Sequence, residues 1–304
     1  MKEFEMFLAN LKNRGKATNT LSAFSRNTTE FFKLMNIEVL ADLKAMKTID
    51  FNTYLEILEN KGNGASTRNA KLSAVNSFCE YLVKIDLLDK NMVRTVDRAK
   101  VPSRVSVQPT KEEAQKILNK VKRRPKLHTL YTVLMNTGLR IEECLSLRLS
   151  DFRDGYVMVR GGKGDKDRLV VLNESCEDIL KNYILNDRKS WTKEELTERL
   201  KGDKRLIAKA VANADLIFLG KNGLRIYNSN LNASLTKTAK DCGLDKSIVH
   251  PHAFRHYFGT QFVKQGGDVT ELQKQLGHSS IKTTQIYFDV DTVKVQETMS
   301  RMSF

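Results

Sequence analysis

The sequence of 304 residues has few cysteines and lacks any long apolar run. Its four cysteines, Cys79, Cys144, Cys176 and Cys242, lie far apart and form no C-x-x-C pair. This spacing favours reduced, mostly buried thiols in a cytoplasmic protein over disulfides or a zinc site. No apolar stretch approaches the length of a membrane span, and the first residues show no secretory signal. We therefore expect no membrane partner.

Positive charge is in large excess, with 51 Lys and Arg against 36 Asp and Glu, a net charge of +15. Such an excess favours a polyanionic partner. The charge is spread along the chain and not concentrated in one amphipathic helix, so nucleic acid fits better than a membrane surface. A hydrophobic content of 40% is enough for real cores, and the length suits one large domain or two medium ones.

The first ninety or so residues carry apolar side chains at helical spacing. Positions 4, 7, 8 and 11 follow the i, i+3, i+4, i+7 rule, and three further segments behave alike. These segments predict a small four-helix domain over residues 1–96. The apolar positions of these helices lie within residues 4–11, 21–35, 51–58 and 72–82; the third helix should stop near Gly62 and the fourth should begin after Thr67.

Residues 97–110 break this pattern. They hold Pro102 and Pro109 together with the cations Arg98, Lys100 and Arg104, and they contain no long apolar run. This composition predicts an extended basic linker. A linker of this kind lets two domains close around a rod-like ligand.

The remaining residues, 111–304, read as a second domain of mixed structure. A helix start at Thr110 with acidic residues in the first turn opens it, and a helix through residues 127–134 ends at Gly138. Strands are expected at residues 156–160 and 168–172, joined by a glycine-rich hairpin tip, and a short strand is possible at 216–219. The sequence thus predicts a mainly α protein with a small antiparallel sheet (α+β).

Two basic sites in this domain each allow two interpretations. Arg140 and Glu143 lie three residues apart, so on a helix they form either a surface ion pair or an arginine that a buried carboxylate orients towards a phosphate. Lys163 lies between two glycines at the hairpin tip. It is either part of a solvated basic turn or an ammonium that reaches a DNA strand and protonates a leaving oxygen.

His252 and Arg255 share one face of a helix that Pro251 would begin. The arginine offers a planar fork for two phosphate oxygens. Three of the five histidines cluster here, but no carboxylate or cysteine completes a metal-ligand set, and Arg255 would repel a cation. We therefore expect no metal, and His250 and His256 are expected to be structural or DNA-contacting.

Near the C-terminus, His278 follows Gly277, and Tyr287 comes nine residues later. A lone tyrosine between Ile286 and Phe288 is by itself typical of a packing residue. The alternative is a phenol that attacks a phosphodiester, and the other motifs of the chain favour it.

Five motifs occur in an order that resembles the tyrosine recombinase (phage integrase, Xer-like) superfamily, and the resemblance covers most of the chain. The motifs are T-G-L-R-I-x-E, G-K-G-x-K-x-R, H-A-F-R-H, L-G-H and T-T-x-x-Y. The resemblance implies an N-terminal SAM-like core-binding domain, followed by a catalytic domain with a C-terminal tail. The charged segment 186–214 looks like an insertion relative to compact Xer-like proteins.

The resemblance also implies the roles of the site residues. The activating residues would be Arg140, Lys163, His252, Arg255 and His278, with Tyr287 as nucleophile and Glu143 in support. Tyr287 would attack a DNA phosphate and leave a 3′-phosphotyrosine, which a hydroxyl from another strand then resolves. Because the covalent link conserves the bond free energy, no ATP, metal or other cofactor is expected.

The implied partner is a double-stranded recombination site, on which family members act as four protomers bound to two duplexes. The tail carries Val290, Val293, Met299 and Met302, which would dock on a neighbouring protomer or on their own domain. Two rival functions remain at this point. One is a type IB topoisomerase, which uses nearly the same chemistry, and the other is a DNA-binding protein without catalysis.

Overall fold

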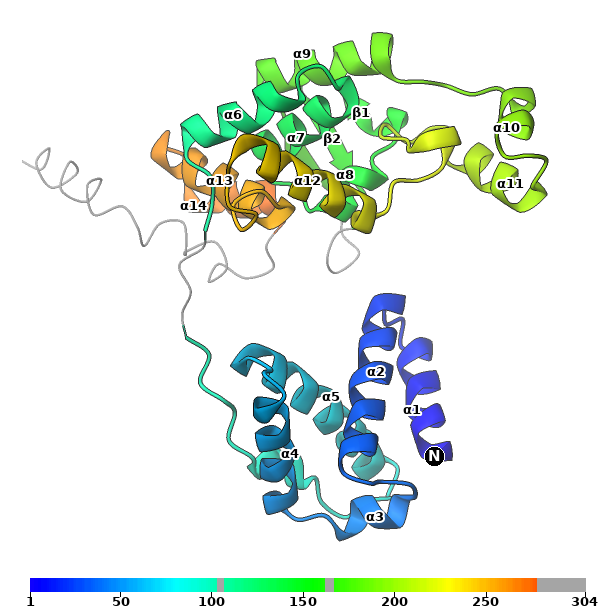
Figure 1. The fold of residues 1–304 in the computed structure, drawn as a ribbon, viewed down its shortest axis with the longest axis vertical. Coiled ribbons are helices and arrows are strands. Elements are labelled where there is room, and N and C mark those ends of the chain that lie inside the picture. The colour runs from blue at the N-terminus through cyan, green and yellow to red at the C-terminus, as the bar shows by residue number, and fades with distance from the viewer. Residues whose placement is uncertain (103–106, 162–166, 278–304) are drawn as a thin grey trace, which may run out of the picture. The chain divides into compact units, whose positions relative to one another are not determined.

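The structure, a computed structural model, describes residues 1–102, 107–161 and 167–277 (Figure 1). The chain divides into two compact units, Met1–Arg104 and Val105–Phe304.

The first unit is helical throughout its described elements. The four predicted helices are confirmed as α1, α2, α4 and α5, because their apolar stripes meet in one core that includes Phe7, Phe31, Tyr54 and Phe78. Two short elements, α3 and the 3-10 helix η1, were not predicted. The bounds are α1 Lys2–Asn13, α2 Thr18–Leu34, α3 Leu40–Ala45, α4 Thr48–Asn60, α5 Ala65–Lys84 and η1 Met92–Thr95.

The first residues of the predicted linker lie along α5. The side-chain amide of Asn69 donates to the carbonyl of Ala99 (2.8 Å) and accepts from its N–H (3.0 Å). Arg98 donates to the hydroxyl of Ser73 (2.8 Å). These contacts tie this stretch to the first unit, although it is neither helix nor strand.

The second unit is mainly helical with one small antiparallel sheet, as predicted. Its core centres on α7, which is buried on most sides, and α13 packs against it through Phe254 and Tyr131. The bounds are α6 Lys111–Val121, α7 Pro125–Thr137, α8 Ile141–Ser146, η2 Leu149–Asp151, β1 Phe152–Arg153, β2 Tyr156–Val159, β3 Arg168–Val171, α9 Glu174–Asn182, η3 Tyr183–Asp187, α10 Lys193–Arg199, α11 Lys204–Ala212, η4 Lys221–Gly223, α12 Asn228–Cys242, α13 Pro251–Lys264 and α14 Val269–Leu276.

The sheet has the order β1-β2-β3, and Val157 pairs with Val170 across its centre. The two predicted strands are confirmed, and β1 was missed. The short strand considered at residues 216–219 is wrong. That segment makes only isolated bridges, Leu216 to Arg148 and Leu219 to Arg225, because its buried apolar side chains fill the core without joining a ladder.

The predicted start of a helix at Thr110 and the predicted end of a helix at Gly138 are confirmed. Thr110 and Glu113 form the reciprocal cap of α6, with the Thr110 hydroxyl accepting from the Glu113 N–H (3.2 Å) and the Glu113 carboxylate accepting from the Thr110 N–H (2.8 Å). α7 ends at Gly138, whose φ of +63° is the left-handed conformation that glycine favours.

The charged segment 186–214, which looks like an insertion, holds two short helices, α10 and α11. They share a small core of their own, made of Leu196, Leu200, Ile207 and Ala210. Figure 1 shows them at one end of the unit, with α13 and α14 at the other. All four cysteines of the chain are free and buried. In the parts of the chain that the structure describes, no helix is apolar over a length that would cross a bilayer.

Candidate active site

Arg140 lies in the turn between α7 and α8 and is held by Glu143. The Arg140 N–H donates to Glu143 Oε2 (2.9 Å), and its Nη1 donates to Glu143 Oε1 (2.8 Å). The Glu143 side chain is only 10% exposed, whereas that of Arg140 is 32% exposed. Of the two interpretations above, the structure supports a buried carboxylate that orients an arginine with an accessible surface.

Arg168, the first residue of β3, holds the same carboxylate from the other side. Its Nη1 donates to Glu143 Oε1 (3.0 Å) and its Nη2 to Oε2 (2.8 Å). Burial alone would raise the pKa of Glu143, but the hydrogen bonds from Arg168 and Arg140 outweigh it and lower the pKa below its usual value. The carboxylate therefore stays ionised at neutral pH.

Arg168 was not among the predicted site residues. The only signal was its place as the last residue of G-K-G-x-K-x-R. Its contact with Glu143 joins residues that are 25 positions apart, which no helical spacing could reveal.

Arg255 lies on α13 and is almost completely buried, with 5% of its surface exposed. Its Nη1 donates to the carbonyl of Gly138 (2.6 Å), and its Nη2 donates to the carbonyl of Leu276 (2.8 Å). These carbonyls lie at the C-terminal ends of α7 and α14, where helix dipoles favour a positive charge. Arg255 thus joins three helices, and its guanidinium is fixed by backbone atoms.

The histidines of α13 have different roles. Nδ1 of His250 accepts from the Ala253 N–H (3.2 Å) and caps the helix, which is a structural role. The side chain of His252 is exposed, yet partial desolvation, followed by the charges of Arg255 and Arg140, lowers its pKa. Burial likewise lowers the pKa of His256. His252 is therefore neutral at pH 7 and lies within the electrostatic reach of both arginines.

The structure thus brings together Arg140, Glu143, His252 and Arg255, from the α7–α8 turn and from α13. Lys163, His278 and Tyr287 lie outside the described residues. Among the residues that are described, no group of three His, Cys, Asp or Glu side chains could hold a metal ion. The site offers fixed positive charge and a neutral imidazole, which suits the binding of a phosphodiester.

Comparison with known proteins identifies the family. The model of the "Phage integrase family" matches residues 109–293, and that of the "Phage integrase, N-terminal SAM-like domain" matches residues 4–85. The chain belongs to the phage integrase family. The resemblance inferred from the five motifs is confirmed.

Two curated relatives extend over nearly the whole chain. A tyrosine recombinase XerD of Oceanobacillus iheyensis is 26% identical over 291 residues, covering 93% of this chain and 92% of the relative. A tyrosine recombinase XerC of Listeria welshimeri is 27% identical over 292 residues, covering 94% and 91%.

Solved structures share the fold of the chain. A XerH site-specific recombinase bound to a palindromic difH substrate, in a post-cleavage complex, aligns with a TM-score of 0.71 at 19% identity and covers 95% of this chain and 81% of that one. A lambda integrase (75–356) dimer bound to a core site aligns with a TM-score of 0.71 at 17% identity and covers 94% of each chain.

Proposed function

We propose that this chain cleaves and rejoins DNA at two duplex sites through a covalent bond to Tyr287, with Arg140 and Arg255 holding the reacting phosphate. The chain is a tyrosine-type site-specific recombinase. The observation that carries the assignment of roles is the convergence of three groups: Arg140, which the buried Glu143 holds, Arg255, which backbone carbonyls hold, and a neutral His252 within the electrostatic reach of both.

The two arginines stabilise the charge that grows on the non-bridging oxygens as the phosphorus becomes pentavalent. Arg140 presents the exposed part of its guanidinium, while Arg255 supplies a positive charge fixed by two carbonyls. Charges that are already in place need no reorganisation during the reaction, so they favour the transition state over the bound substrate.

The remaining residues move protons. His252, neutral at pH 7, accepts the phenolic proton of Tyr287 or donates a hydrogen bond to the phosphate, and His278 adds a second hydrogen bond. Lys163 protonates the leaving 5′-oxygen. The resulting 3′-phosphotyrosine conserves the energy of the broken bond, and a 5′-hydroxyl from another strand then releases Tyr287.

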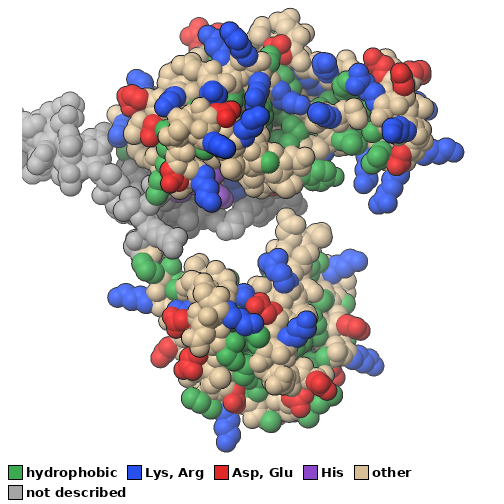
Figure 2. Space-filling model, viewed as in Figure 1, with side chains coloured by type: hydrophobic (Ala, Val, Ile, Leu, Met, Phe, Trp, Pro, Cys, Tyr) green, Lys and Arg blue, Asp and Glu red, His purple; other side chains and the backbone are tan. Residues whose placement is uncertain are grey.

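Positive charge on both units supports binding to the DNA backbone. Figure 2 shows Lys and Arg side chains distributed over the visible face of each unit and not gathered on one helix. Such a surface neutralises many phosphates at once, which gives affinity without reading base sequence.

A nicked suicide substrate, from which the cleaved fragment diffuses away, tests the chemistry. The unmodified chain should form a covalent adduct that survives denaturation, and Tyr287→Phe should bind the same DNA without forming it. Absence of an adduct from the unmodified chain would support the non-catalytic alternative. A plasmid bearing two sites separates recombination from the topoisomerase alternative, because a topoisomerase would relax supercoils without producing recombinant circles.

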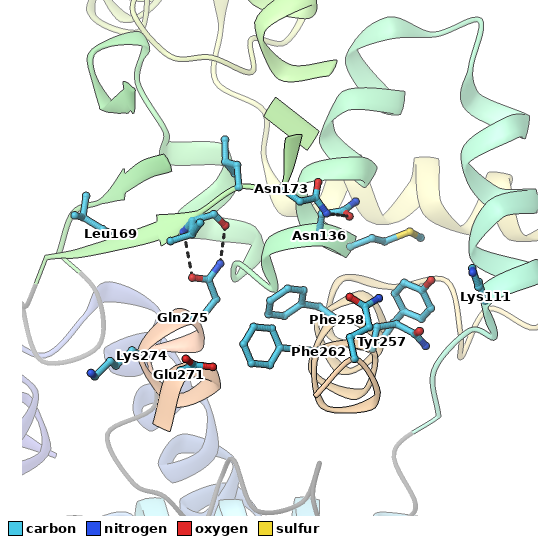
Figure 3. Close-up of a pocket in the computed structure, with 15 residues that line it drawn as sticks. Lys111, Asn136, Leu169, Asn173, Tyr257, Phe258, Phe262, Glu271, Lys274 and Gln275 are labelled. Carbon is cyan, nitrogen blue, oxygen red and sulfur yellow. Dashed lines mark hydrogen bonds between the residues drawn. The ribbon is translucent and has the colours of Figure 1, made fainter. Parts of the chain in front are cut away.

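For the assembly, we propose four protomers on two DNA sites, with the tail of each protomer seated on its neighbour. A cavity of about 740 Å³ between β3, α13 and α14 supports this, since Phe258, Phe262 and Leu169 line it (Figure 3). The apolar residues after position 289 match such a lining. Deleting the residues after Asp291 should weaken synaptic complexes in gel-shift assays and spare binding to a single site. Normal synapsis by the truncated chain would refute tail exchange.

A further inference from the structure

We propose that Arg168 is a positioning residue that keeps Arg140 turned towards the phosphate and ties it to the end of α14. This inference rests on the proposed function. It assigns to Arg168 no contact with the DNA, because only 13% of its side chain is exposed.

Two arginines share the carboxylate of Glu143. Arg168 binds both oxygens of Glu143, at 3.0 and 2.8 Å, in a fork-to-fork pair. The Arg140 guanidinium reaches only Oε1, through a single bond of 2.8 Å. Because Arg168 binds both carboxylate oxygens, the Arg140 guanidinium is anchored by one hydrogen bond, and about a third of the Arg140 side chain remains accessible.

Loss of Arg168 would change the hydrogen bonding of Arg140. Glu143 would remain buried and ionised with Arg140 as its only nearby side-chain cation among the ion pairs described. A carboxylate and a guanidinium prefer two parallel hydrogen bonds, so Arg140 would turn inward onto Glu143. It would then present less charge to the phosphate. Arg168 thus keeps the Arg140 guanidinium from forming two parallel hydrogen bonds with Glu143.

Arg168 also contacts the C-terminal end of α14. Arg168 Nε donates to the carbonyl of Gln275 (3.3 Å), next to the Leu276 carbonyl that Arg255 holds. A Cβ atom on Gly277 would lie 2.9 Å from Arg168 Cζ and Nε, so the guanidinium lies against the glycine backbone. The end of α14 is therefore fixed by Arg168 and Arg255 together, directly before His278.

A side chain of α14 completes the attachment. The amide of Gln275 donates to the Val171 carbonyl (2.8 Å) and accepts from the Val171 N–H (3.1 Å), which fastens α14 to the edge of β3 (Figure 3). Arg168 and Val171 are the two ends of β3. Strand β3 thus carries both the residue that supports Arg140 and the residue to which α14 is attached.

The test compares Arg168→Ala and Arg168→Lys with the control Arg153→Ala. Arg153 is an exposed arginine on β1 whose side chain donates to the Phe152 carbonyl (3.4 Å), so its loss removes the same charge from the same sheet. Single-turnover adduct formation, DNA affinity and melting temperature are measured for each full-length variant. We expect Arg168→Ala to cleave roughly 100-fold more slowly at unchanged DNA affinity, because a small misplacement of a phosphate-holding group has that effect. Arg153→Ala should stay within about twofold of the unmodified chain.

A double-mutant cycle with Glu143→Ala separates positioning from general stabilisation. If Arg168 acts through Glu143, the loss caused by Arg168→Ala shrinks to a few-fold once Glu143 is already alanine. Rate losses that multiply would overturn the proposal, as would normal cleavage by folded Arg168→Ala. If Arg168→Ala does not fold, Arg168→Lys decides, because it retains the charge but lacks the fork and should still cleave at least tenfold more slowly. An unmodified chain that forms no adduct would refute the proposed function itself.

Discussion

Gly138 and Gly243 offer a matched pair for testing how tightly the site is packed. Each ends a helix in the left-handed conformation, with φ of +63° at the end of α7 and +62° at the end of α12. Their surroundings differ completely. A Cβ atom on Gly138 would lie 2.5 Å from Leu276 Cδ2 and from Phe258 Cδ1, whereas one on Gly243 would have no neighbour within 4 Å.

The two substitutions by alanine therefore share one penalty and differ in a second. The left-handed conformation costs an alanine about 1 kcal/mol, and Gly243→Ala should lose roughly that much stability. Gly138→Ala adds the strain of overpacking, typically 1–3 kcal/mol, because Leu276 is fully buried and cannot simply swing away. We expect a total of about 2–4 kcal/mol for Gly138→Ala. For a unit of this size, the melting temperature should fall by roughly 4–16 °C for Gly138→Ala and by roughly 2–4 °C for Gly243→Ala.

The effect on cleavage should be larger than the effect on folding. The carbonyls of Gly138 and Leu276 both accept hydrogen bonds from Arg255, so a shift between α7 and α14 moves that guanidinium. Melting curves and single-turnover cleavage below the melting temperature measure both effects. Equal stability losses for the two variants, or normal cleavage by folded Gly138→Ala, would refute the argument that this glycine sets the position of Arg255.

Three further predictions concern charge. Arg255→Lys keeps the positive charge but cannot reach both carbonyls, so single-turnover cleavage should fall by about 100-fold while DNA affinity is retained; cleavage near the normal rate would contradict the assigned role. The pKa values of His250, His252 and His256 lie below the ordinary 6.5, so the unfolded chain binds more protons and the free energy of unfolding should decrease as the pH falls below 6.5. Urea titrations at pH 7.5 and 5.5 check this, and equal midpoints would show that these shifts are absent. Binding to DNA should weaken with salt at a log–log slope of about −7 if eight phosphates are neutralised, and a flat response would argue against the basic surface.

The parts of the fold that could be predicted carry strong local signals. The stripe of α1, the cap at Thr110 and the glycine at the end of α7 each follow from a few neighbouring residues. α3 has six residues and β1 has two, too few for any periodicity to show. The buried run at residues 216–219 has no alternation, so its apolar residues could not distinguish a strand from a core-filling segment.

The sequence predicted which of the described residues belong to the candidate site, but not which atoms hold their side chains in place. Arg140 and Glu143 could be paired from their spacing, and the motifs pointed to His252 and Arg255. Arg255 donates to backbone carbonyls 117 and 21 positions away, and backbone acceptors leave no trace in side-chain identity. The sharing of the Glu143 carboxylate by Arg168 and Arg140 could not be predicted either, because it depends on the packing of β3 beside α8.

The two arginines consequently respond differently to acid. Arg255 is held by carbonyls, which do not titrate, whereas Arg140 depends on a carboxylate that does. The pKa of Glu143 is lowered below its usual value, so this carboxylate stays ionised throughout the range in which histidines gain protons. Any loss of cleavage between pH 7 and pH 6 must therefore come from a group other than the two phosphate-holding arginines. His252 is the described residue whose protonation would both remove a proton acceptor and add a charge beside them. A His252→Gln variant that kept the full pH dependence would exclude it and direct attention to His278.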